Sequence, residues 1–353
     1  MKLYNLGKVP WLESQLLYHT LARQGEDALC LVSPSTPYVC IGFHQDLEQE
    51  VDLAYCRERN LPVFRREVGG GAVYLDGHQF FYQLILGRNH PAVPGNKEAF
   101  YRKFLEPVIQ TYRRVGVPAE LKPVNDVIVR GRKIAGTGVG EIGDAIVFVG
   151  NLILDFDYQT MARVLKVPDE KFRDHVYQTL TDNLTTLRRE LGPEDASQLS
   201  EERLNGLLVE EFGKLLGPLV PAEPSEELGA EMTALAGRMT GRDWLYRKGR
   251  VMADRQVKIR EGVTVVSRLH KAVGGLIRLT YEDREGRFGQ VSISGDFFCY
   301  PEEGLLDLEQ ALTGNPVSQA DRIIEAFYGR TRWETPGIAL SDWQQVFAPG
   351  PRL

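Results

Sequence analysis

Two glycine-rich segments of this sequence combine an unobstructed backbone with cationic side chains. The first contains Arg66 and then the consecutive glycines Gly69, Gly70 and Gly71, directly after a predicted strand. Glycines let a ligand approach the main chain and its N–H groups, and an arginine can hold a carboxylate or a phosphate. The spacing matches neither a P-loop nor a Rossmann fingerprint. An anion-binding loop and a plain glycine-rich turn or bulge both remain compatible with the segment.

The second segment begins with Asn125-Asp126 and reaches Lys133 after the turn Arg130-Gly131-Arg132. A carboxylate such as Asp126 can bind Mg²⁺ together with substrate phosphates, and the mobile ammonium of Lys133 can reach an oxyanion. Lys133 alone would be an ordinary exposed hairpin lysine. Two glycine-rich hairpins with cationic residues in one region favour a site for an anionic ligand.

Both segments resemble motifs of lipoate–protein ligases. Arg65–Tyr74 is similar to the RRxxGGGAVY signature of that family, and residues 125–136 are similar to its ND…GRKISG segment. Weaker resemblances cover Tyr38–Asp46, Val149–Asp155, Thr181–Leu184 and Ser292–Phe298. Gln79, Val149 and Asn151 stand where the family usually has asparagine, histidine and threonine. The Asn-Asp…Lys-Ile-Ala-Gly pattern also resembles biotin–protein ligases.

The resemblance implies an ATP-dependent ligase that joins lipoate to AMP and then transfers the lipoyl group to a lysine of an acceptor lipoyl domain. Lys133 would be the catalytic residue, in contact with the lipoate carbonyl and the AMP phosphate. ATP and Mg²⁺ are the implied cofactors, with Asp126 helping to place the metal. The residues implied to bind substrate or nucleotide are Arg66, Gly69, Gly70, Gly71, Ala72, Val73, Tyr74, Asn125, Asp126, Lys133, Ile134, Ala135, Gly136 and Thr137.

The implied partners are lipoyl domains, either of a 2-oxoacid dehydrogenase E2 component or of a glycine-cleavage H-type protein. Such domains are generally acidic, so a basic rim is expected near the site. Its candidates are Arg65, Arg130 and Arg132, which are equally compatible with ordinary solvated arginines. Candidate walls for the apolar tail of lipoate are Val73, Tyr74, Val127 and Val129, which are equally compatible with an ordinary core.

Three other functions remain open on the sequence. A cysteine-dependent octanoyltransferase of the same superfamily needs a thiolate beside the lysine hairpin, and no cysteine lies between Cys56 and Cys299. Cysteine-free transferases are usually shorter and lack a second domain. A biotin ligase usually has a glycine- and arginine-rich substrate loop, which is absent here. A non-catalytic binder of the lipoyl-adenylate is also compatible.

The elements around these segments predict an α+β protein. Apolar runs predict strands at 28–33, 38–43, 62–66, 80–86, 126–129, 134–136 and 147–154, and helical spacing predicts helices at 13–23, 104–115 and 204–216. We therefore expect a mixed β-sheet catalytic domain of the biotin/lipoate ligase type over residues 1–220 and a linker over 221–240, with a short helix around Met232. A small α+β C-terminal accessory domain should follow over 241–353. Its predicted strands are 257–260, 263–269, 276–281 and 288–294, and its predicted helices are 305–312 and 319–328.

The composition is that of an ordinary soluble globular protein. The 353 residues carry a net charge of −6, and 43% of them are hydrophobic. This mild acidity disfavours a general nucleic-acid binder, and the absence of any long apolar run disfavours a membrane span or a signal peptide. The four cysteines lack CxxC spacing, which disfavours a zinc ribbon or a disulfide framework. We expect a cytoplasmic protein.

Overall fold

The computed structural model describes residues 1–123, 125–167, 169–247, 263–329 and 333–348, which form two compact units. The first unit contains Met1–Cys40, Val51–Glu67 and Val73–Gly241. The second contains Ile41–Glu50, Val68–Ala72 and the chain from Arg242 onwards. The triglycine segment therefore belongs to the second unit, which the sequence pattern did not predict.

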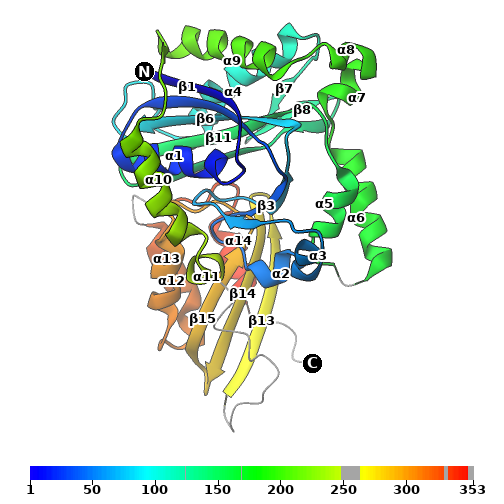
Figure 1. Cartoon of the computed structure of the whole chain (residues 1–353). Coiled ribbons are helices and arrows are strands. Elements are labelled where there is room, and N and C mark those ends of the chain that lie inside the picture. The colour runs from blue at the N-terminus through cyan, green and yellow to red at the C-terminus, as the bar shows by residue number, and fades with distance from the viewer. Residues whose placement is uncertain (124, 168, 248–262, 330–332, 349–353) are drawn as a thin grey trace. The chain divides into compact units, whose positions relative to one another are not determined.

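A mixed six-stranded sheet forms the centre of the first unit as described (Figure 1). Its strands, in spatial order, are β10 (Thr137–Ile142), β11 (Ala145–Ile153), β6 (Gln79–Gly87), β2 (Ala28–Pro34), β1 (Lys2–Val9) and β12 (Val220–Pro221). β1 pairs in parallel with β2 and β12, whereas the other neighbours are antiparallel. This mixed sheet with helices confirms the α+β class. β1 was not predicted, because only part of it is buried and its apolar residues do not alternate regularly.

Helices cover both faces of this sheet. Those of the first unit are α1 (Glu13–Gln24), α3 (Leu53–Glu58), α4 (Lys97–Arg114), α5 (Tyr158–Val164), α6 (Glu170–Asn183), α7 (Leu187–Leu191), α8 (Pro193–Ser197), α9 (Glu201–Leu216) and α10 (Glu226–Met239). Successive strand residues point to opposite faces. Thus Tyr82 of β6 directs its ring toward Phe212 of α9, with 6.1 Å between centroids, while the adjacent Gln83 donates to the main-chain oxygen of Ser14 in α1 at 2.7 Å. α4 packs on α9, so these two helices cover one face and α1 covers the other (Figure 1).

Two smaller sheets of the first unit hold most of the motif residues. One has the order β4-β3-β5 and the other the order β7-β8-β9. Their strands are β3 (Tyr38–Ile41), β4 (Val63–Arg65), β5 (Val73–Leu75), β7 (Glu120–Lys122), β8 (Asp126–Val129) and β9 (Arg132–Ala135). The hairpin predicted around residues 130–132 is confirmed. Arg130 and Gly131 form its turn with φ values of 50° and 81°, the pair of positive angles that a tight two-residue hairpin requires.

The segment predicted as a linker is mostly helical. Residues 226–239 form α10, whose Leu228, Met232, Leu235 and Met239 are buried, and this helix packs against α1. Its apolar residues at helical spacing explain why it joins the first unit rather than connecting two domains freely. The short helix predicted around Met232 is confirmed and is longer than expected. The first unit runs on to Gly241, and the second unit resumes at Arg242.

The second unit is built on an antiparallel three-stranded sheet of β13 (Val263–Ala272), β14 (Gly275–Arg284) and β15 (Arg287–Gly295). Its helices include α2 (Leu47–Glu50), α11 (Arg242–Leu245), α12 (Gly304–Leu312), α13 (Ala320–Tyr328) and α14 (Leu340–Phe347). The strands predicted at 263–269, 276–281 and 288–294 and both predicted helices are confirmed. The strand predicted at 257–260 lies outside the described residues. α14 was not predicted, and its buried Trp343 is part of the core of this unit. Across the described chain, no helix has both the length and the apolar character that crossing a membrane requires.

Candidate active site

The β8–β9 hairpin presents an ion pair to solvent. Lys133 Nζ lies 2.7 Å from Asp126 Oδ1, and the two side chains are 38% and 33% exposed. Beside them, the Thr137 hydroxyl donates to the main-chain oxygen of Asn125 at 2.7 Å. Asn125, Asp126, Lys133 and Thr137 are therefore brought together, as the sequence predicted, and the ammonium of Lys133 is accessible to a ligand.

The backbone of Lys133 is held on both sides. β9 pairs with β8 on one side, and on the other the Lys133 carbonyl accepts a hydrogen bond from the Thr185 amide at 2.8 Å. Leu184, the neighbour of Thr185, forms a parallel bridge with Lys133. The Thr181–Leu184 segment, noted for its resemblance alone, thus ends directly beside the lysine. A strand fixed on both edges limits the motion of the side chain that it carries.

Glu190 stabilises this arrangement and was missed by the sequence analysis. Its side chain is 1% exposed and accepts hydrogen bonds from Arg130 at 3.0 Å, Arg132 at 2.9 Å and the Thr185 hydroxyl at 2.6 Å. Glu190 lies 60 positions after Arg130 and 58 after Arg132, so no local spacing could have indicated these contacts. The carboxylate binds the hairpin to the segment that flanks Lys133.

A chain of buried amide groups connects the hairpin to the other motif. The Gly136 amide donates to Asn151 Oδ1 at 2.7 Å, and Asn151 Nδ2 donates to Gln79 Oε1 at 2.9 Å. Gln79 Nε2 in turn donates to the Tyr74 main-chain oxygen at 3.2 Å. Gln79 and Asn151 are two of the departures from the family pattern, and they hydrogen-bond to each other. Tyr74 and Gly136, one residue from each motif, are thereby tied together within the first unit.

Arg66 lies at the edge of the β3–β5 pair. Its Nη1 donates to the Cys40 main-chain oxygen at 3.4 Å, and Cys40 is the register partner of Val73. The guanidinium is therefore next to the predicted wall residue Val73. Tyr74 donates its amide to the Met161 sulfur at 3.2 Å and is almost fully buried.

Several predicted site residues are core residues. Val127, Val129, Ile134 and Ala135 are all 0% exposed. All four support the hairpin from inside, and for Val127 and Val129 this agrees with the core alternative. Arg65 is also 0% exposed, so its prediction as a rim residue was wrong: strand β4 places its side chain in the interior. Arg130 remains on the surface, and Arg132 is partly exposed.

Two of the three glycines, Gly69 and Gly70, have structural reasons of their own in the second unit. Gly70 adopts a φ of 92°, which favours glycine, and its carbonyl closely approaches Gly42. A Cβ on Gly69 would lie 2.7 Å from the Phe298 ring. Gly69–Ala72 and Lys133 belong to different units, so their approach to one another stays a prediction. An open groove lined by β15 and α12, including Arg287 and Glu309, contains none of the predicted site residues.

None of the four cysteines is poised as a nucleophile. All are buried, and burial raises the pKa of the Cys30 and Cys40 thiols above the ordinary value and that of Cys56 to about 11. Arg66 opposes the shift at Cys40, but burial is the larger influence on that pKa. A thiol with a raised pKa is protonated and unreactive at neutral pH.

The described residues contain no cluster of three or more histidine, cysteine or acidic side chains that could hold a metal by itself. Mg²⁺, however, commonly uses one or two carboxylates and completes its shell with water and substrate phosphates. The partly exposed Asp126 fits that requirement. Any Mg²⁺ here would depend on nucleotide phosphates for most of its ligands.

These features define a class of protein: a mixed-sheet α+β enzyme domain with a lysine on a rigid, solvent-facing hairpin. The family described as the lipoyl protein ligase A/B catalytic domain matches residues 11–213, which is more than half of the chain. The chain belongs to this family, and the predicted resemblance is confirmed.

Relatives with two different activities are similar to the chain. Lipoate–protein ligase 1 of Staphylococcus aureus is 26% identical over 299 residues, covering 82% of this chain and 81% of that protein. Octanoyltransferase LipM of Kyrpidia tusciae is 26% identical over 235 residues, covering 60% of this chain and 84% of that protein. The family is therefore shared by ligases and transferases.

Solved structures show the same fold. LipL1 of P. falciparum, determined in complex with lipoate, has a TM-score of 0.71 at 16% identity, covering 98% of both chains. A bipartite lipoate–protein ligase of Thermoplasma acidophilum, studied with its E2 lipoyl domain, has a TM-score of 0.61 at 23% identity, covering 69% of this chain and 95% of that one. A lipoate–protein ligase A bound with ATP has a TM-score of 0.56 at 20% identity, covering 69% of this chain and 98% of that one.

Proposed function

We propose that the protein is an ATP-dependent lipoate–protein ligase that forms lipoyl-AMP and transfers the lipoyl group to a lysine of a lipoyl domain. The observation that carries this proposal is the Lys133–Asp126 pair, with an accessible ammonium on a hairpin held at both edges. A preorganised cation of this kind stabilises the charge that develops in both half-reactions.

In the first half-reaction, a lipoate carboxylate oxygen attacks the α-phosphorus of ATP, and the bond from that phosphorus to pyrophosphate breaks. Negative charge accumulates on the phosphoryl oxygens, and Lys133 would hydrogen-bond to them. Arg66 would hold the lipoate carboxylate or the phosphate. Asp126 would help to hold Mg²⁺, which neutralises phosphate charge when it is bound.

In the second half-reaction, the acceptor lysine amine attacks the acyl carbonyl of lipoyl-AMP. An amide bond forms, the bond to AMP breaks, and the amine proton is released to solvent. Lys133 would stabilise the oxyanion on the acyl carbon and then the departing AMP phosphate. Accordingly, both half-reactions would use the same ammonium group.

The buried thiols favour a ligase over a cysteine-dependent transferase. Such a transferase must hold its acyl group on a thiolate near the lysine, and the thiols of this protein are buried with raised pKa values at Cys30, Cys40 and Cys56. The similarity to an octanoyltransferase LipM makes acyl transfer from a carrier protein the second candidate function. A non-catalytic lipoyl-adenylate binder would need an inactive Lys133.

The acceptor proposed here is a lipoyl domain of an E2 component or of a glycine-cleavage H-type protein, in the cytoplasm. A structural relative was studied with its E2 lipoyl domain, which supports this choice. We further propose that the second unit is an accessory domain that supports adenylate formation. The first unit, which contains Lys133, Asp126 and Arg66, would be the catalytic domain.

One assay separates these functions. The purified full-length chain is incubated with a lipoyl domain and either free lipoate plus ATP and Mg²⁺ or octanoyl-carrier protein without ATP. The proposal expects pyrophosphate release and lipoylation only in the first mixture. Modification only in the second would establish the transferase. Adenylate bound without turnover would establish the binder.

A further inference from the structure

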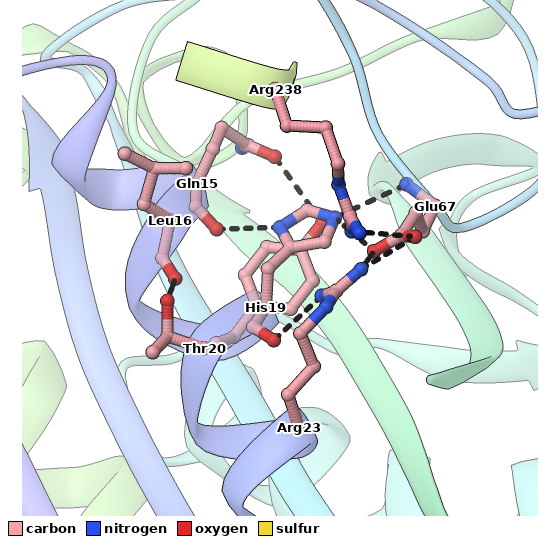
Figure 2. Close-up of polar contacts among 8 residues, drawn as sticks. Gln15, Leu16, His19, Thr20, Arg23, Glu67 and Arg238 are labelled. Carbon is pink, nitrogen blue, oxygen red and sulfur yellow. Dashed lines mark hydrogen bonds and ion pairs between the residues drawn. The ribbon is translucent and has the colours of Figure 1, made fainter. Parts of the chain in front are cut away.

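Helix α1 holds Glu67 through both its main chain and its side chain (Figure 2). The Glu67 amide donates to His19 Nε2 at 3.1 Å, and its carboxylate accepts from Arg23 Nη2 at 2.7 and 2.5 Å. His19 and Arg23 are four residues apart and therefore lie on one face of the helix. We call these three residues the Glu67 anchor.

The histidine of this anchor has a defined proton arrangement. Its Nδ1 lies 2.6 Å from the Gln15 carbonyl, which can only accept, so Nδ1 carries the proton and Nε2 accepts from Glu67. The His19 side chain is fully buried, and this burial lowers its pKa to about 4. The neutral ring that the acceptor role requires is thus the form present near neutral pH.

Glu67 directly follows Arg66, a residue of the proposed active site, in the first unit. Arg66 precedes it and extends toward Cys40, the register partner of Val73. Val68 and then the triglycine segment follow it, and Glu67 is the last residue of the first unit before that segment. A fixed Glu67 therefore constrains the backbone from which the Arg66 side chain extends.

We propose that His19, Arg23 and Glu67 are positioning residues that hold Arg66 in the orientation that binds the anionic group of the substrate. This inference rests on the proposed function, because it takes Arg66 as a substrate ligand. The three residues themselves do not contact substrate.

The chemistry of the anchor fits positioning better than general packing. The Arg23 and Glu67 side chains are 28% and 14% exposed, so their ion pair contributes only modestly to the stability of the fold through charge. The charge-assisted contact of Arg23 Nη2 with both Glu67 oxygens and the N–H to imidazole bond are directional. Together they constrain Glu67 from its main chain and from its side chain.

Two substitutions of His19 separate positioning from folding. Asparagine keeps a donor near Nδ1 for the Gln15 carbonyl but leaves the Glu67 amide without an acceptor. Glutamine reaches the Nε2 position and keeps that acceptor. We expect His19→Asn to accelerate hydrogen exchange at the Glu67 amide and to raise KM for lipoate, each about tenfold, with kcat within about twofold. His19→Gln should remain near the wild type in both measurements.

Exchange is read by mass spectrometry on the peptide covering residues 64–72 of the full-length chain, with melting temperatures recorded beside it. Equal exchange and equal KM in the two variants would overturn the proposal, as would faster exchange with an unchanged KM. If His19→Asn does not fold, Arg23→Gln replaces it with the same expectations. A wild type that forms no lipoyl-AMP would instead contradict the proposed function, and the exchange comparison would still decide whether the anchor holds the Glu67 main chain.

Discussion

The Lys133 hairpin and the Glu67 anchor contain the same kind of charged contact in different surroundings. At the hairpin, the lysine and the aspartate are both more than 30% exposed. At the anchor, Arg23 and Glu67 are 28% and 14% exposed, and the adjacent neutral histidine is fully buried. A solvent-exposed ion pair is weak and can be exchanged for a ligand, whereas the anchor adds a hydrogen bond from the Glu67 main chain to a buried ring and so fixes the backbone. The comparison indicates that the Lys133 hairpin is arranged to take part in the reaction and that the Glu67 anchor is arranged to position Arg66.

The largest expected effect separates activity from stability at the hairpin. Lys133→Ala should lower the rates of adenylate formation and lipoyl transfer by roughly a hundredfold or more, about 3 kcal/mol of transition-state stabilisation. It should change the free energy of unfolding by less than about 1 kcal/mol, because the ion pair that it removes is exposed. Single-turnover rates and urea denaturation measure the two quantities.

Lys2 offers a matched control for that variant. It also forms an ion pair with a carboxylate, Glu26, at 2.8 Å, and it is 53% exposed on β1. Lys2→Ala should leave both rates unchanged. A Lys133→Ala protein with near-normal rates would show that the hairpin lysine does not act in the chemistry.

The second prediction concerns the buried histidine and pH. His19 has a pKa near 4 in the fold, against an ordinary value of 6.5, because burial disfavours its charged form. Glu67, Arg23 and Arg238 face it: the carboxylate opposes this shift and the two arginines add to it. As pH falls below 6.5, His19 becomes protonated in the unfolded chain. In the folded chain it stays neutral down to about pH 4. Stability present above pH 6.5 is therefore lost between these values, by at most about 3 kcal/mol.

This loss is measured as the difference in unfolding free energy between wild type and His19→Gln at several pH values. The difference should fall across that window and be constant above it. His175→Gln, which changes an exposed histidine on α6, is measured alongside as a control. A parallel pH dependence of wild type and His19→Gln would mean that His19 is not held neutral by burial.

The same two regions show what the sequence can predict. The hairpin was predictable because its turn and its lysine are local: Arg130-Gly131 forms the turn, and Lys133 follows two residues later. The anchor was not, since Glu67 meets His19 across 48 positions and no local spacing relates the two residues. Glu190 was missed for the same reason.

α10 was read as a linker because prolines precede it, although its own apolar spacing is helical. Assignment of the triglycine segment to the second unit depends on packing against Phe298, which no local rule contains.

The third prediction extends the comparison to the carboxylate beneath the hairpin. Glu190→Ala should lower the free energy of unfolding by about 2 kcal/mol, because Arg130, Arg132 and Thr185 all lose an acceptor that is 1% exposed. Urea denaturation measures it. Glu210→Ala is the control: Glu210 is 59% exposed and pairs with Arg114 at 2.6 Å, and its loss should have little effect. Equal losses in the two variants would remove the distinction between buried and exposed pairs on which the comparison depends.

The smallest expected effect concerns Arg238, a second arginine near the Glu67 anchor. Arg238 approaches Glu67 at 3.9 Å and is 57% exposed, whereas Arg23 binds the same carboxylate through two short contacts and is 28% exposed (Figure 2). Arg238→Ala should change the unfolding free energy by less than about 0.5 kcal/mol, and Arg23→Ala by about 1 kcal/mol or more. Both arginines carry the same charge, so a larger loss for Arg23→Ala reflects its shorter contacts, including its bond to the His19 main-chain oxygen at 2.8 Å. Similar losses of unfolding free energy would mean that only the positive charge near Glu67 matters, not the direction of its contacts. This result would contradict a directional anchor.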